Sequence, residues 1–115
     1  MIQPGIYTAL HGLVEGRCYA GVAPDNPVTP YIVFSRVASV PENTLSSGQP
    51  VQKTRIQVDM YDKSYDAAQS LADSVQVAIL TLAYPIQATQ TLEQDMYESE
   101  VKLHRVSHDY SIYHR

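Results

Sequence analysis

The segment from Gln52 to Leu82 constrains the fold most, because its apolar period changes from two to about 3.6 residues within a few positions. Up to Asp62, the residues that alternate onto one face are Thr54, Ile56, Val58 and Met60, and those on the other face are Lys53, Arg55, Gln57, Asp59 and Tyr61. Beyond Tyr65 the apolar stripe has helical spacing and consists of Ala68, Leu71, Ala72, Val75, Ile79 and Leu82. The sequence therefore predicts a half-buried strand followed directly by an amphipathic helix.

The ends of this helix carry their own signals. Ser64 is suited to cap the first turn, and Asp66 lies where a negative charge favours the helix dipole. Pro85 cannot continue a helix, so the helix is expected to stop before it.

A shorter helix is predicted at the N-terminus. Ile2, Ile6, Leu10 and Leu13 recur at three- and four-residue spacing, Pro4 favours a helix start, and Gly12 or Gly16 favours its end. Residues 17–22 then predict a brief strand, and a connector follows in which Pro24, Pro27 and Pro30 hold the chain extended.

Two further segments complete the pattern. Residues 31–40 are rich in β-branched and aromatic side chains and predict a central strand, whereas residues 41–50 carry turn formers and predict a loop. With the strand over 52–62 they predict an extended antiparallel hairpin whose tip projects. Residues 86–97 and 101–113 predict two more strands separated by a turn near Glu98 to Glu100.

This order of elements predicts the fold class. With hairpins on either side of the long helix and no repeated βαβ unit, we expect an α+β domain: a mainly antiparallel sheet with two helices packed on one face. A chain of 115 residues is the usual size of one domain, so residues 1–115 are expected to form a single unit.

The opposite face of the predicted sheet is rich in tyrosine. Tyr61 and Tyr113, with Tyr31 as a further candidate, would lie there. Aromatic patches of this kind commonly mark protein interfaces, so Tyr61 and Tyr113 are interface candidates. Scattered, half-buried surface tyrosines are the alternative.

The net charge and the distribution of charged residues limit the kinds of partner that the chain is expected to bind. A net charge of −4 with scattered basic residues argues against binding nucleic acid through its phosphates. The acidic residues Glu93, Asp95, Glu98 and Glu100 cluster, which is typical of a solvated loop or strand end, with a charged patch for a partner or a metal as the alternative.

No residue pattern predicts catalysis. His104 and His108 share a strand face but lie about 13 Å apart along it, and His108 and Asp109 point to opposite faces. Cys18 lacks a nearby helix N-terminus or a cluster of basic residues that would lower the pKa of its thiol, and it is expected to be inert and half-buried. We therefore expect no enzyme, and no catalytic, cofactor or metal site.

The cysteine content and the lack of long apolar runs indicate where the chain is made. A lone cysteine fits a reducing compartment, and the sequence shows neither a secretion signal nor an apolar run of about 20 residues. The chain is expected to be made in a cytoplasm, with no membrane partner.

Taken in order, these segments resemble the tail-completion family of tailed bacteriophages and prophages, the small tail-terminator or head-tail joining proteins. The resemblance spans nearly the whole chain and is most specific where residues 55–62 run into residues 65–75. The other matching segments are residues 16–19, Ala23-Pro24, residues 30–34 and residues 105–113. Relatives often carry Trp near the strand end and at the C-terminus, where this chain has Tyr61 and Tyr113.

The resemblance implies a structural protein of the virion tail. It implies a ring, of six copies, that caps the tail tube and joins it to the head connector, with DNA only passing through the lumen. Its partners would be further copies of itself, the tail-tube protein and the head-connector protein. The residues expected to contact a partner lie in the predicted loop and are Glu42, Asn43, Thr44, Leu45, Ser46, Ser47 and Gly48. The alternatives are an ordinary surface hairpin loop and, for the whole chain, a small non-catalytic protein-binding module of a bacterial pathway.

Overall fold

A computed structural model of the chain describes residues 3–22, 24, 28–43, 50–81, 87–100 and 102–114. Along these residues the chain forms helices and strands in the following order: α1 (Gln3–Leu10), the 3₁₀ helix η1 (His11–Val14), β1 (Cys18–Ala20), β2 (Tyr31–Asn43), β3 (Pro50–Asp62), α2 (Tyr65–Leu80), β4 (Gln87–Glu98) and β5 (Leu103–His114).

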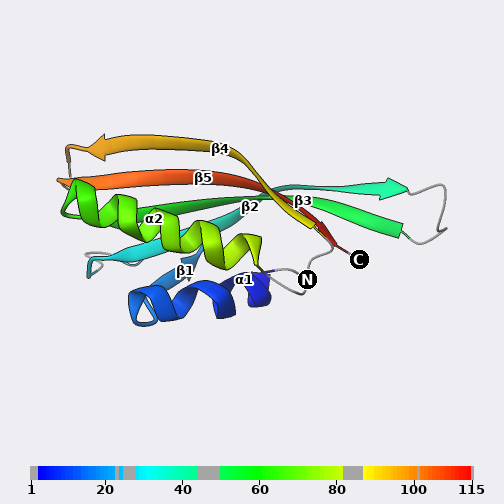
Figure 1. The fold of residues 1–115 in the computed structure, drawn as a ribbon, viewed down its shortest axis with the longest axis horizontal. Coiled ribbons are helices and arrows are strands. Elements are labelled where there is room, and N and C mark those ends of the chain that lie inside the picture. Colours follow the sequence, from blue (N-terminus) through cyan, green and yellow to red (C-terminus); the bar gives the residue numbers. More distant parts are fainter. Residues whose placement is uncertain are drawn as a thin grey trace.

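The strands form one mixed sheet in the order β1-β2-β3-β5-β4 (Figure 1). Every neighbouring pair is antiparallel except β1 and β2, which are parallel. The predicted α+β class with a mainly antiparallel sheet is confirmed. The middle strand is β3, whereas β2, which we expected to be central, lies one place nearer the edge.

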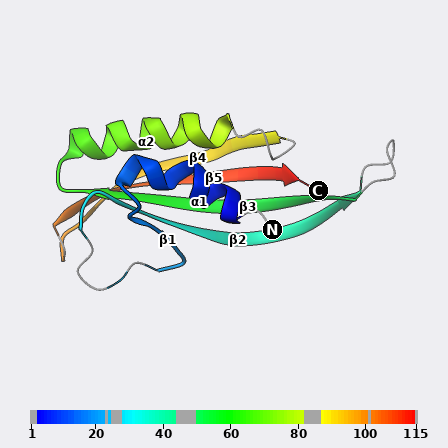
Figure 2. The ribbon, with the colours of Figure 1, turned by 90° about the horizontal axis from the view of Figure 1, so that it is seen from below.

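Both α-helices cover the same face of the sheet (Figure 2). The alternation predicted for β3 is confirmed, because Thr54, Ile56, Val58 and Met60 are all buried. The stripe predicted for α2 packs against them, and its described members are buried as well. The core between helices and sheet consists of Ile6, Leu10, Val14, Cys18, Ile32, Phe34, Ile56, Val58, Met60, Ala68, Leu71, Ala72, Val75, Ile79, Val106, Tyr110 and Ile112.

The start of α2 is as predicted and its end is earlier. Ser64 caps the helix, since its Oγ accepts a hydrogen bond from the Ala67 N–H at 3.4 Å. The helix ends at Leu80, because Thr81 leaves helical geometry while its hydroxyl donates to the Val77 carbonyl at 2.6 Å. Leu82 and Pro85, which we expected to end the helix, lie outside the described residues.

The N-terminal helix differs from the prediction in one core residue. The chain tightens into η1 after Leu10, which turns Val14 inward and leaves Leu13 38% exposed. A regular α-helix would have continued the predicted stripe through Leu13. Ile2 lies outside the described residues.

The strands around the predicted loop are longer than expected. The residues at both ends of this loop, 41–43 and 50, are strand, with Asn43 paired to Pro50. Proline is tolerated at the start of a strand and in an edge strand. Pro50 begins β3, and β1 pairs only with residues 32–34 of β2, so the Pro41 end of β2 is an edge.

Candidate functional site

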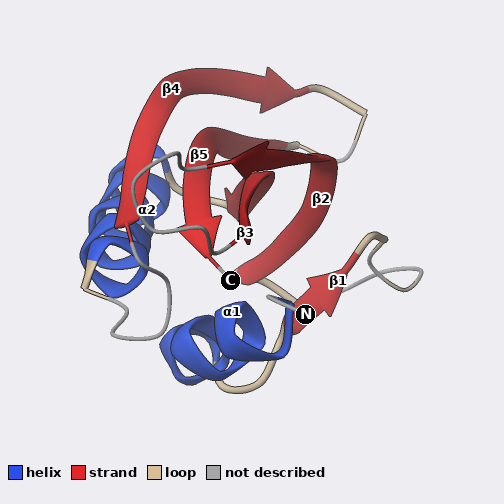
Figure 3. Ribbon diagram, turned by 90° about the vertical axis from the view of Figure 1, so that its right-hand side faces the viewer, coloured by secondary structure: helices blue, strands red, loops and turns tan. Residues whose placement is uncertain are grey.

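The face of the sheet opposite α1 and α2 carries no described helix (Figures 2 and 3). We call it the uncovered face. Its residues follow from strand register: Tyr61 of β3 pairs with Tyr31 of β2 and with Arg105 of β5, and Lys53 pairs with Tyr113. It therefore carries the three tyrosines that the sequence placed opposite the core.

Arg105 forms ion pairs with two carboxylates on the uncovered face. Its guanidinium lies 3.2 Å from the Asp59 carboxylate and donates to Glu98 Oε1 at 3.0 Å. Burial by itself lowers the pKa of Arg105, but the hydrogen bond to Glu98 and the charge of Asp59 outweigh this effect and raise it. Three strands, β3, β4 and β5, are thereby joined by one cation.

Three tyrosines at one end of this face contact one another, and two of them stack. The rings of Tyr31 and Tyr61 are nearly parallel, with centroids 4.6 Å apart, and Tyr19 of β1 lies 6.3 Å from Tyr31. The Arg105 guanidinium sits 5.8 Å from the centre of the Tyr61 ring. Burial is the main cause that raises the pKa of both Tyr31 and Tyr61, so these phenols remain neutral at physiological pH.

The two predicted interface tyrosines occupy opposite ends of the uncovered face. Tyr61 lies eight positions along β3 from Lys53, the partner of Tyr113, which corresponds to roughly 26 Å along the strand. Tyr113 is half-buried, and the Lys53 ammonium lies 5.9 Å from its ring centre. Between the two ends, Arg55 and Asp109 form a second ion pair at 3.2 Å. The structure thus places both tyrosines on one face and does not bring them together.

The hairpin of β2 and β3 projects beyond the rest of the sheet (Figure 1). β5 pairs with β3 only as far as Gln52, whereas β2 and β3 stay paired through Asn43 and Pro50. This agrees with the predicted projecting hairpin. Glu42 and Asn43, two of the predicted contact residues, end β2, while Thr44, Leu45, Ser46, Ser47 and Gly48 lie outside the described residues.

The predicted acidic cluster is divided by the pleat of β4. Glu93 and Asp95 pair with His108 and Val106 on the helix side, whereas Glu98 turns to Arg105 on the uncovered face. Glu93 and Asp95 therefore lie within a strand rather than in a loop. Across residues 3–22, 24, 28–43, 50–81, 87–100 and 102–114, no three His, Cys, Asp or Glu side chains gather as metal ligands.

His108 is a buried polar residue whose contacts the sequence did not indicate. Its side chain is fully buried, with Nε2 at 2.5 Å from Glu93 Oε2 and Nδ1 at 2.7 Å from the Tyr110 hydroxyl. His104 shares its face, as predicted, but contacts Tyr97 instead, with ring centroids 4.9 Å apart and the two rings tilted by 57°. Alternation gives the face of a strand residue, but only the register of β4 reveals that Glu93 lies beside His108.

Cys18 is more buried than expected. It belongs to the core with 4% exposure, and burial raises the pKa of its thiol to about 12. The thiolate, which is the nucleophilic form, is therefore scarce at physiological pH.

Comparisons with known proteins agree with this geometry. A family model described as "Tail completion protein gp17" matches residues 5–115, whereas no curated protein matches the chain significantly. A chain from a solved structure, the virion of a native gene transfer agent particle, has the same fold. It is 11% identical, with a TM-score of 0.64 over 94% of this chain and 90% of that chain. Among the described helices, none is long and apolar enough to cross a membrane. Since the family match covers almost the entire sequence, the chain belongs to the phage tail completion protein gp17 family, a family of structural proteins of the virion tail.

Proposed function

We propose that this tail protein forms a ring, of six copies, that caps the tail tube and joins it to the head connector. Its role in this proposal is structural, with no reaction catalysed. The observation that carries the proposal is a sheet covered by helices on one face only, with stacked tyrosines and paired charges on the other. Membership of the tail completion family supports the place of this surface in a virion tail.

A ring requires two different surfaces on each subunit, because a head-to-tail contact joins unlike patches. The sheet offers two unlike edges. At one edge β4 runs for twelve residues, and at the other β1 covers only residues 32–34 of β2. These edges support a ring in which one border of a subunit meets the other border of the next copy.

The projecting hairpin supports a second contact, along the axis of the ring. Its described end, where Asn43 pairs with Pro50, extends past the end of β5 and can reach a neighbouring ring without moving the core. We assign docking to the tail-tube or head-connector protein to this hairpin, including Glu42 and Asn43. The net charge of −4 suits a lumen through which DNA slides without adhering.

Reconstitution tests the proposal. The chain is purified and mixed with tail tubes formed by the tube protein encoded beside it, and the mixture is imaged by negative stain. We expect one ring at one end of each tube and binding of the neighbouring head-connector protein to that end. A chain that stays monomeric and binds neither component would favour the alternative, a small non-catalytic protein-binding module of a bacterial pathway.

A hairpin variant separates docking from ring formation. Residues 42–51 are replaced by Asn-Gly, a two-residue turn that suits a tight hairpin. The core lies outside the replaced segment, so we expect the variant to fold and to form rings that no longer attach to tubes. Attachment at the unaltered level would overturn the assignment of docking to the hairpin.

A further inference from the structure

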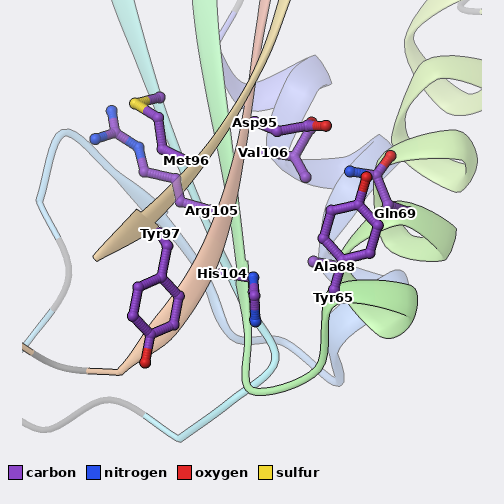
Figure 4. A pocket seen from close by; sticks show the side chains of 9 residues that line it. All are labelled: Tyr65, Ala68, Gln69, Asp95, Met96, Tyr97, His104, Arg105 and Val106. Carbon is purple, nitrogen blue, oxygen red and sulfur yellow. The ribbon is translucent and has the colours of Figure 1, made fainter. Parts of the chain in front are cut away.

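The beginning of α2 and the end of β4 lie at the end of the sheet opposite the projecting hairpin (Figure 1). A pocket of about 270 Å³ lies between them (Figure 4). Three rings line it: Tyr65 from α2, Tyr97 from β4 and His104 from β5. His104 stands between the tyrosines, edge-on to Tyr65 at 5.8 Å and tilted toward Tyr97 at 4.9 Å. Both tyrosines are more than half exposed, so the rings are open to a partner.

Three polar groups of residues that line this pocket lack partners in the described part of the chain: the Asp95 carboxylate, Gln69 Nε2 and Arg105 Nε. Asp95 lines it and makes no hydrogen bond or ion pair with any described residue. The Nε2 of Gln69, on the first turns of α2, is buried and finds no acceptor in the described part of the chain. A buried donor without an acceptor is costly, so this atom favours a ligand that brings one.

The pocket carries one uncompensated charge, and that charge is negative. Arg105 also lines the pocket, but its guanidinium turns to the uncovered face, where Asp59 and Glu98 neutralise it (Figure 4). Asp95 is therefore left to pair with a cation from outside, next to aromatic faces that themselves attract cations.

We propose that this pocket binds an arginine side chain of an adjoining protein subunit. The guanidinium pairs with Asp95 and stacks on the aromatic rings, and a carbonyl of the same partner segment accepts from Gln69. Arginine fits better than lysine because its planar, weakly hydrated head group both stacks and forms paired hydrogen bonds. The volume suits one inserted side chain, since small-molecule sites usually measure about 300–1,000 Å³. The inference rests on the pocket itself and does not require the ring.

The test is a titration of the purified chain with the blocked peptide acetyl-Gly-Arg-Gly-amide, followed by NMR. The same peptide with citrulline, which has the shape of arginine without its charge, is the matched ligand control. We expect saturable shifts of the Tyr65, Tyr97 and His104 ring signals with the arginine peptide and at least about tenfold weaker binding of the citrulline peptide. Equal binding of both peptides, or no saturable shift, would overturn the proposal.

Variants locate the binding. Asp95→Asn should weaken the arginine peptide by about tenfold, whereas Asp73→Asn, which removes an exposed charge elsewhere, on α2, should leave its affinity unchanged. Equal losses in the two variants would show that only the overall charge matters and would also overturn the proposal. Ring formation on tail tubes, measured separately, decides the proposed function whatever the peptide result.

Discussion

The Glu93 carboxylate accepts a hydrogen bond from the fully buried ring of His108 at 2.5 Å. The second ring nitrogen of His108 lies 2.7 Å from the Tyr110 hydroxyl. Both ring nitrogens of the imidazole thus have a polar partner although the side chain is fully buried. Glu93, from the edge strand, supplies a partner that no other described residue provides.

Glu93→Ala should destabilise the fold, because it leaves a buried imidazole nitrogen without its partner. We expect the free energy of unfolding to fall by about 1–3 kcal/mol, and by less in Glu93→Gln, whose amide oxygen can still accept. Urea denaturation measures both. Asp95→Ala is the matched control, because Asp95 lies on the same face of the same strand and its carboxylate has no partner among the described residues. It should change the free energy of unfolding by at most about 0.5 kcal/mol. Equal losses for Glu93→Ala and Asp95→Ala would contradict this role of Glu93.

Replacement of Arg105, on the uncovered face, should also destabilise the fold. Arg105→Met leaves Asp59, which is 8% exposed, without its counter-charge, so we expect a loss of about 1–3 kcal/mol in the free energy of unfolding. In Arg55→Met the broken ion pair is half-exposed on the arginine side, so the loss should stay below about 1 kcal/mol. Chemical denaturation of the two variants compares them directly. If Arg105→Met lowered the free energy of unfolding no more than Arg55→Met does, the ion pairs of Arg105 would not stabilise the sheet as proposed.

Cys18 gives a prediction about pH. Burial raises the pKa of its thiol from 9.0 to about 12, so the folded chain holds this proton where the unfolded chain has released it. This contribution to stability is complete below pH 9 and is lost as the pH rises from 9 toward 12. At pH 8, a disulfide reagent should therefore label Cys18 slowly in the folded chain and rapidly in urea, as followed by absorbance. Cys18→Ala supplies the blank, and rapid labelling of the folded chain would contradict the assigned burial.

Much of the fold could be predicted because each element carries its own period. The alternation along residues 52–62 and the stripe from Ala68 to Ile79 specify their buried faces without reference to other segments. The prediction that Leu13 faces the core was wrong, because a single turn of 3₁₀ helix redirects the side chains after Leu10. No residue pattern in this segment indicates the change from α to 3₁₀ geometry. The parallel pairing of β1 with β2 could not be predicted either, because the pattern of a three-residue strand does not specify its partner or its direction.

The site was less predictable than the fold. Tyr61 and Tyr113 were placed on the correct face by alternation alone, whereas their role in an interface stays a prediction. The contacts among Arg105, Asp59 and Glu98 could not be foreseen, because they require the register of three strands. The same limit applies to the pocket beside His104, whose walls come from separate segments of the chain.

Tyr113 tests whether the uncovered face makes protein contacts. Tyr61 is a poor probe, because its ring also stacks on Tyr31 and its removal would disturb the sheet. Tyr113→Ser removes a half-buried ring near the C-terminal end of β5 and should change the free energy of unfolding little. It should weaken association of the chain with itself by about tenfold or more, because aromatic side chains commonly contribute most of the binding energy of an interface. Sedimentation velocity over a range of concentrations, with tail tubes present, measures that association. Tyr7→Ser, which removes an exposed ring from α1 on the opposite side of the sheet, should associate normally. If both variants associated alike, the uncovered face would not be the contact surface, and the covered side would have to supply it.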